Sequence, residues 1–145
     1  MNYQHILVPV DGSEYSSRAV QHAVELAKIF NSTITIVQVL TLDPLIATEY
    51  IKTGKSNEVL DRARNYILDN LNKLAQNYQQ DNLNLHTQLL EDFSIVQGIT
   101  QAAKDLNADL VVMGSHGRTG LSKFLLGSVA QRALLELPLP VLIVR

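Results

Sequence analysis

Short apolar runs alternate with longer amphipathic stretches along the chain, and this alternation predicts the number and kind of its strands. The runs at 6–10, 33–40, 110–113 and 141–144 are almost continuously apolar or β-branched, which is typical of strands buried on both faces of a sheet. The run at 83–89 instead alternates apolar with polar residues, which indicates an edge strand with one face in water. Five strands are therefore expected.

The stretches between these runs carry apolar residues at steps of three and four, which predicts four helices. Their apolar faces fall within 19–30, 60–78, 96–106 and 128–137. Strands and helices thus alternate strictly, and this order is typical of a parallel sheet covered by helices on both faces. The expected fold class is α/β, an open and Rossmann-like five-stranded parallel sheet, in which ligands bind beyond the carboxyl ends of the strands.

Polar residues at the ends of the helical patterns predict where the helices begin and stop. Ser13 or Ser16 is expected to cap the first helix, and Asn31 is expected to end it. Two Ser-x-x-Gln patterns fit capping boxes, so Ser94 and Ser128 are predicted as the N-caps of the last two helices.

Length and composition indicate one ordinary globular domain spanning 1–145. The chain is 46% hydrophobic and 18% charged, with a net charge of −2, which gives no reason to expect nucleic acid or an anionic membrane as the partner. It contains no cysteine, which excludes disulfides and thiolate metal sites. No apolar run approaches the roughly 20 residues of a membrane span, and the start lacks a signal-peptide pattern, so a cytoplasmic protein is expected.

A glycine-rich loop follows the run at 110–113 and closes where the last helical pattern begins. Its glycines are Gly114, Gly117, Gly120 and Gly127, and His116 and Arg118 are basic residues near its start. Glycines let a backbone approach a ligand closely, and a helix start offers N–H groups with partial positive charge. The loop therefore predicts an anion site, with phosphate as the expected anion.

The spacing of this loop matches neither common phosphate signature, since it lacks both GxxxxGK[ST] and GxGxxG. It has instead Gly-x2-Gly-x9-Gly-Ser, at Gly114, Gly117, Gly127 and Ser128. Together with the stretches 9–13 and 138–144, this pattern resembles the universal stress protein family over the whole chain. The glycine motif is similar to that of the ATP-binding branch of the family.

The resemblance implies a sheet of order 3-2-1-4-5 and a set of nucleotide-binding residues. Phosphate would lie against Gly114, Gly117, Gly127, Ser128 and the adjacent Val129, with Ser115, His116, Arg118, Thr119 and Gly120 wrapping the ribose and phosphates. The backbone of Val39 would recognise adenine, and Pro9 and Asp11 would border the nucleoside. Asp11 would also reach Mg²⁺ that arrives with the nucleotide.

Other interpretations of these residues remain open from the sequence. Asp11 would also suit a purely structural role in the turn, and Ser128 a role as a helix cap. His116 and Arg118 would also fit solvated surface groups of the loop.

The resemblance further implies a homodimer in which the last strands pair antiparallel through Val141, Leu142, Ile143 and Val144. An exposed apolar edge strand is a liability that soluble proteins avoid, and a covering loop is the alternative to a second subunit.

The expected function is that of an ATP-binding regulatory dimer that presents itself to a protein partner. One alternative is a slow ATPase or phosphotransferase, although the sequence shows no clear activator of a nucleophile. Another is an interaction module that binds ADP, AMP or a cyclic nucleotide. The stretch 41–55 has no regular pattern and is interpreted as a surface loop, with a lid or a partner contact as alternatives.

Overall fold

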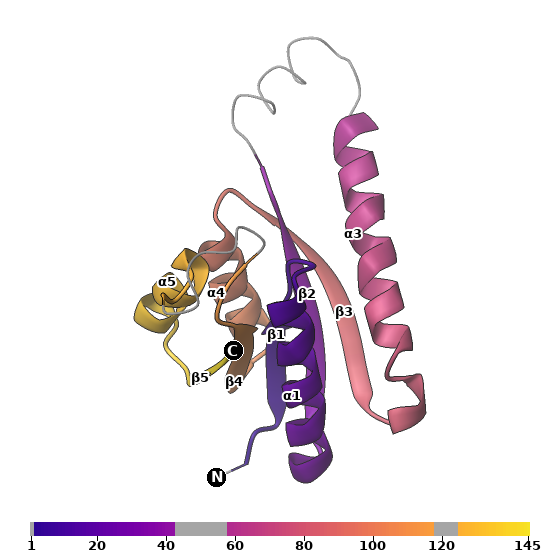
Figure 1. Ribbon diagram of the computed structural model, residues 1–145, viewed down its shortest axis with the longest axis vertical. Helices are drawn as coiled ribbons and strands as arrows, with labels where there is room; N and C mark the ends of the chain where they lie inside the picture. The colour runs from indigo at the N-terminus through magenta and orange to yellow at the C-terminus, as the bar shows by residue number, and fades with distance from the viewer. Residues whose placement is uncertain (1, 43–57, 118–124) are drawn as a thin grey trace.

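A computed structural model of the chain describes residues 2–42, 58–117 and 125–145 (Figure 1). Its centre is a sheet of five parallel strands in the order β3-β2-β1-β4-β5, as predicted. The strands are β1 (His5–Pro9), β2 (Thr33–Thr41), β3 (Asn84–Asp92), β4 (Leu110–Gly114) and β5 (Val141–Val144). The order changes direction between β1 and β4, so the ligand crevice of this fold class is expected beyond their carboxyl ends.

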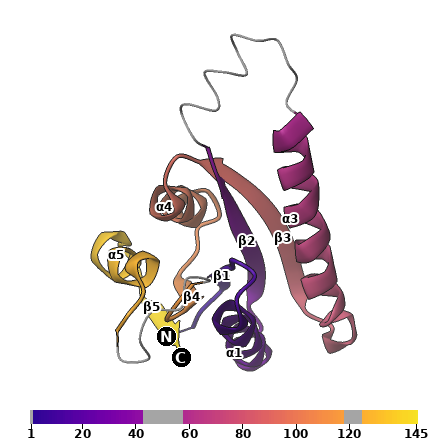
Figure 2. The same ribbon diagram turned by 45° about the horizontal axis from the view of Figure 1, so that its top comes forward.

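Helices cover both faces of the sheet, because alternate residues of each buried strand point to opposite sides. Figure 2 shows α1 (Glu14–Phe30) and α3 (Glu58–Gln76) on one face, with α4 (Ile95–Asp105) and α5 (Ser128–Glu136) on the other. A short 3₁₀ helix, η1 (Gln79–Asp81), follows α3. All four predicted helices are thus present.

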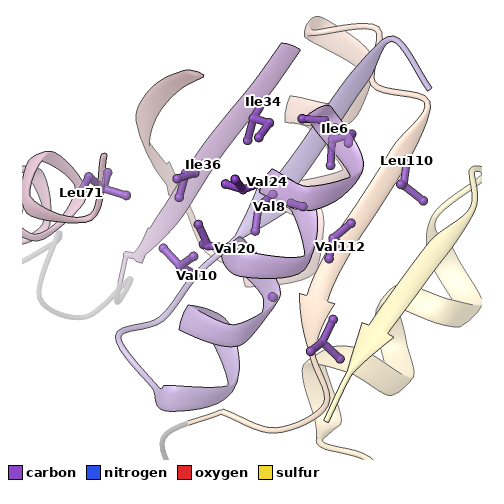
Figure 3. Close-up of a cluster of buried hydrophobic side chains, with 14 of the residues drawn as sticks. Ile6, Val8, Val10, Val20, Val24, Ile34, Ile36, Leu71, Leu110 and Val112 are labelled. Carbon is purple, nitrogen blue, oxygen red and sulfur yellow. The ribbon is translucent and has the colours of Figure 1, made fainter. Parts of the chain in front are cut away.

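Two separate apolar clusters hold these layers together. The cluster under α1 and α3 includes Ile6, Val8 and Ile34 of the sheet, together with Val20 and Leu71 of the helices (Figure 3). The cluster under α4 and α5 takes the intervening strand residues, among them Leu7, Val37 and Val111. The continuous apolar runs of the sequence are explained by this burial on both faces.

The edge position of β3 confirms the interpretation of its alternating pattern. It pairs with β2 along its whole length, from Thr33 beside Asn84 to Thr41 beside Asp92. This pairing carries β3 three residues beyond the predicted end at 89. The stretch 41–55, interpreted as a loop from the sequence, falls largely outside the described residues.

Most predicted helix boundaries are correct, with one exception at α5. Ser13 caps α1, where its Oγ accepts a hydrogen bond from the Ser16 N–H at 3.2 Å, and Ser94 caps α4 in the same way. Asn31 ends α1 with a left-handed φ of 56°. Ser128, however, does not cap α5: it is the first helical residue, and Gly127 occupies the N-cap without a side-chain hydrogen bond.

The apparent capping box does not form at the start of α5, because Ser128 already belongs to the helix and the Gln131 side chain is engaged elsewhere. The Gly127 N–H donates to the Ser115 carbonyl at 2.7 Å, which ties the chain entry to the end of β4. The Gln131 side chain donates to the Leu126 carbonyl instead of reaching back to Ser128. Within the described ranges, no helix is long and apolar enough to cross a membrane.

Candidate functional site

A cavity of about 320 Å³ opens at the carboxyl ends of β1 and β4, within the size range of small-molecule pockets. It lies at the point where the strand order changes direction. Its walls come from five elements and the turns beside them. The lining residues are Pro9, Val10, Asp11, Ser16, Ile95, Ile99, Met113, Gly114, Ser115, His116, Gly117, Gly127, Ser128, Val129 and Ala130.

The turn after β1 is built from its own side chains. Asp11 Oδ1 accepts a hydrogen bond from the Ser13 N–H at 2.9 Å, and Ser16 Oγ donates to the Ser13 carbonyl at 2.9 Å. Gly12 takes a left-handed φ of 85°, a conformation that glycine adopts at little cost. Asp11 therefore has the structural role that the sequence left open.

The second carboxylate oxygen of Asp11 faces the glycine loop. A Cβ placed on Gly117 would lie 2.8 Å from Asp11 Oδ2, so the carboxylate fills the space that a side chain at Gly117 would need. Asp11 thus lies between the end of β1 and the loop that follows β4. This position suits a group that contacts a ligand in the cavity as well as the turn.

Gly114 and Gly127 are required by close approach and not by unusual backbone angles. A Cβ on Gly114 would lie 2.9 Å from the backbone carbonyl carbon of Tyr15, in the first turn of α1. A Cβ on Gly127 would lie 3.0 Å from the Ser115 carbonyl oxygen, although its φ of −62° suits any residue. Each of these two glycines therefore marks a close contact: Gly114 packs against α1, and Gly127 at the start of α5 packs against the residues that follow β4.

The first turn of α5 faces the cavity through Ser128, Val129 and Ala130. Its N-cap, Gly127, supplies no side-chain hydrogen bond. The first N–H groups of a helix carry partial positive charge and lack partners within the helix. This turn is therefore suited to an anion.

Ser115 and His116 are buried, with 2% and 9% of their surfaces exposed. Ser115 Oγ and His116 Nδ1 share a hydrogen bond of 2.8 Å, and the imidazole lies 5.0 Å from the ring of Tyr15. The interpretation of His116 as a solvated surface group is therefore wrong, because α1 supplies a ring against which it packs. Arg118, Thr119 and Gly120 lie outside the described residues.

Val39 does not line the cavity. Its side chain packs in the cluster beneath α4, where a Cβ on Gly98 would lie 3.1 Å from Val39 Cγ2. Since the predicted role concerned the backbone of Val39, that role stays a prediction.

Apolar wall residues from α4 and β4 were missed from the sequence. Ile95 and Ile99 of α4 and Met113 of β4 line the cavity. Ile95 could have been placed at the cavity from the sequence, because it follows the Ser94 cap and helix starts in this fold lie beside the carboxyl ends of the strands.

The residues described here hold no group of three or more His, Cys, Asp or Glu side chains placed to bind a metal. Among the lining residues that the structure describes, Asp11 is the one carboxylate. A metal ion at this site would therefore need most of its ligands from the bound molecule and from water.

Comparison with known proteins agrees with the fold described above. The model of the universal stress protein family matches residues 2–145. Universal stress protein MJ0531 of Methanocaldococcus jannaschii is 33% identical over 144 residues, which cover 99% of this chain and 82% of that protein.

Two solved structures share the fold over essentially the whole chain. One is a universal stress protein in complex with cAMP, with a TM-score of 0.77, 22% identity and coverage of 100% of this chain and 99% of the other. Another is the universal stress protein from Archaeoglobus fulgidus in complex with dAMP, with a TM-score of 0.69, 20% identity and full coverage of both chains. The family match and the Methanocaldococcus relative show that this chain belongs to the universal stress protein family.

Proposed function

We propose that the chain binds an adenine nucleotide, ATP, with its phosphates at the first turn of α5. The observation that carries this proposal is the difference among the helix starts around the cavity. Ser13 and Ser94 cap α1 and α4 with their own side chains, whereas Gly127 leaves α5 without a side-chain cap. A phosphate oxygen would supply the acceptors that α5 lacks.

The proposed roles follow from the positions of the residues around the cavity. Gly114, Gly117 and Gly127 bring the backbone close to the phosphates, and Ser128 and Val129 offer N–H groups to them. Arg118, Thr119 and Gly120 continue the same loop around the ribose and phosphates. Pro9 and Asp11 border the nucleoside from β1, and the backbone of Val39 recognises adenine.

Mg²⁺ is proposed to enter with the nucleotide. Asp11 Oδ1 is occupied by the Ser13 N–H, so Oδ2 is the oxygen that would face the cation. Mg²⁺ is commonly held by one or two carboxylates together with phosphate oxygens and water, which fits a cavity whose described lining residues include the carboxylate of Asp11.

The nature of the base is supported by the relatives. The two structures described above hold cAMP and dAMP, which are both adenine nucleotides. The apolar wall formed by Ile95, Ile99 and Met113 suits a flat base, because ligand sites are mostly apolar with a few placed polar groups.

The proposed unit is a cytoplasmic, single-domain homodimer that acts on a protein partner. β5 is the edge of the sheet, and 38% of the Leu142 surface is exposed there. Pairing through Val141, Leu142, Ile143 and Val144 would cover this apolar edge. The Val144 carbonyl accepts from the Ser115 N–H at 2.8 Å, so β5 is bonded directly to the residue that holds Gly127.

Calorimetric titration of nucleotide-stripped protein with ATP, ADP, AMP, cAMP and GTP, with and without Mg²⁺, tests the binding proposal. We expect selectivity for adenine over guanine and an affinity that rises from AMP to ATP. Folded protein that binds none of these nucleotides would overturn it.

Sedimentation velocity tests the dimer. A lysine in place of Leu142 is expected to give monomers, because a charge would be buried in the paired edge. Leu68→Lys on α3, where 41% of the surface is exposed on an element at the far side of the sheet from β5, is the matched control and should leave the dimer intact. A wild-type protein that sediments as a monomer at all concentrations would contradict this part.

A further inference from the structure

A stack of three side chains lies behind the cavity wall and includes two residues that do not line it. His116 lines the cavity, while Tyr15 and Arg18 of α1 are absent from its walls. We propose that Tyr15 and Arg18 are positioning residues that hold the loop 115–117 in place for the phosphates of a bound nucleotide. This inference rests on the proposed nucleotide binding.

The first contact in this stack joins the start of α1 to the end of β4. Gly114 packs so closely on Tyr15 that a Cβ there would lie 2.9 Å from the Cβ and from the carbonyl carbon of Tyr15. The Tyr15 side chain therefore starts directly beside the loop. Its ring continues along the loop to His116.

The second contact fixes the imidazole of His116. The two ring centroids lie 5.0 Å apart with an angle of 48° between the planes, within the range of favourable aromatic pairs. On the imidazole itself, Nδ1 shares the 2.8 Å hydrogen bond with Ser115 Oγ. The ring contact and this hydrogen bond together restrict the largest side chain of the loop 115–117.

The third contact lies one helical turn along α1. The guanidinium carbon of Arg18 lies 4.7 Å from the centre of the Tyr15 ring, a distance typical of a cation–π contact. Arg18 Nε is buried and has no hydrogen-bond partner in the described structure. A buried N–H donor without a hydrogen bond is unusual. The contact that compensates the Arg18 guanidinium in the described structure is the aromatic face of Tyr15.

The loop held in this way lies directly beside the start of α5, where the phosphates are proposed to bind. The Ser115 carbonyl accepts from the Gly127 N–H, and a Cβ on Gly127 would lie 3.2 Å from the His116 Cα. A shift of the loop would therefore displace the start of α5. Support of this kind from residues outside the site preserves binding geometry, so its loss should weaken contacts with phosphate more than contacts with the nucleoside.

Calorimetric titration of ATP and adenosine into wild-type protein and α1 variants tests the inference. Tyr15→Leu keeps an apolar side chain but removes the ring, and we expect ATP affinity to fall about fivefold while adenosine affinity stays within about twofold. Tyr15→Phe keeps the ring and should restore wild-type ATP affinity. Arg18→Met should lower ATP affinity by about twofold to fivefold, the range expected for a weak cation–π contact.

A double-mutant cycle shows whether Tyr15 acts through His116. Tyr15→Leu combined with His116→Leu should weaken ATP binding no more than the larger single effect, because both variants break the same contact. Thermal unfolding of each variant confirms that it is folded.

The outcomes separate this inference from the proposed function. Wild-type protein that binds neither ATP nor adenosine would overturn the proposed function, and the inference with it. Wild-type binding combined with any of three results would overturn the inference alone: unchanged ATP affinity in Tyr15→Leu, equal losses for ATP and adenosine, or additive losses in the double variant.

Discussion

The first turns of α1 and α5 both border the cavity, but the sequence supplies a side-chain cap for α1 and none for α5. At α1, Ser13 Oγ accepts the Ser16 N–H, and Asp11 Oδ1 accepts the Ser13 N–H, so the turn is bonded to its own side chains. At α5, the N-cap is Gly127, and it has no side chain to offer.

This difference in capping distinguishes the two helix starts as candidate anion sites. Each helix has the same backbone dipole, but a side-chain cap already satisfies part of the first turn of α1. Gly127 leaves the corresponding place at α5 to a ligand, and its missing Cβ lets the Ser115–Gly117 backbone pass close by. Under the proposed function, phosphate therefore binds at the start of α5, while the turn before α1 is structural.

The largest expected effect comes from giving α5 a cap like that of α1. Gly127→Asp places a carboxylate where the phosphates are proposed to bind, and we expect ATP affinity to fall by about 100-fold or more, through repulsion and competition for the same N–H groups. Gly127→Asn adds nearly the same volume without the charge and should lose about tenfold less. Calorimetry measures both affinities, and equal losses in the two variants would show that crowding alone is responsible.

Alanine substitutions at Gly117 and Gly114 are expected to separate a loss of ATP binding from a loss of stability. A Cβ on Gly117 meets the mobile end of the Asp11 side chain, so Gly117→Ala should stay folded and weaken ATP binding by about tenfold, an effect like that of moving a placed ligand contact. A Cβ on Gly114 meets the backbone of Tyr15, so Gly114→Ala should lower the free energy of unfolding by about 1–3 kcal/mol. Urea unfolding and calorimetry on both variants check the contrast. A Gly117→Ala protein that binds ATP as the wild type does would remove Gly117 from the site.

Substitutions at the capped helix starts test the opposite expectation, namely a loss of stability without a loss of ATP affinity. Ser94→Ala removes the bond to the Gln97 N–H and should cost about 1 kcal/mol of stability, as losses of N-cap residues do, while ATP affinity stays within about twofold. Ser13→Ala should behave alike, since Asp11 still accepts the Ser13 backbone N–H. Denaturant midpoints and ATP titrations give the two numbers for each variant. A large loss of ATP affinity in Ser94→Ala would instead place phosphate at α4.

The smallest expected effect lies at the amino ends of the strands, away from the cavity. Burial lowers the pKa of His5 below its ordinary value, and the carboxylate of Asp109 and the Leu106 backbone oppose this shift in part. Because the folded state holds the proton less tightly, stability is complete above the unfolded pKa of about 6.5 and declines as the pH falls below it.

His5→Gln should therefore flatten this decline below about pH 6.5, with ATP affinity unchanged at pH 7.5. Thermal midpoints measured across this range check the first part, and calorimetry checks the second. An unaltered pH profile would show that other groups cause the decline.

Local patterns predicted the features of the fold that depend on neighbours in the sequence. The alternation at 83–89 identified the edge strand, and the continuous apolar runs identified the buried strands. Ser13, Ser94 and Asn31 were recognised as caps because capping depends on residues within one helical turn.

The parts that the sequence did not predict depend on contacts between distant segments. The pattern at Ser128 fits a capping box, but the Ser115 carbonyl at the end of β4 draws the entry to α5 one residue earlier. From the sequence, His116 was interpreted as a surface residue because no neighbouring residue indicates that it packs on a ring. The Tyr15 ring that it contacts lies about a hundred residues earlier in the chain. Ile99 and Met113 joined the cavity wall through the packing of α4 on the sheet.

Amide chemical shifts from NMR, followed during titration with ATP and with adenosine, test the central claim most directly. We predict that ATP, and not adenosine, shifts the amide signals of Ser128, Val129 and Ala130 strongly, while those of Ser16 and Gln97 at the capped helix starts change little. A saturating ATP titration that shifts the Ser16 or Gln97 amides and leaves the first turn of α5 unchanged would contradict the account.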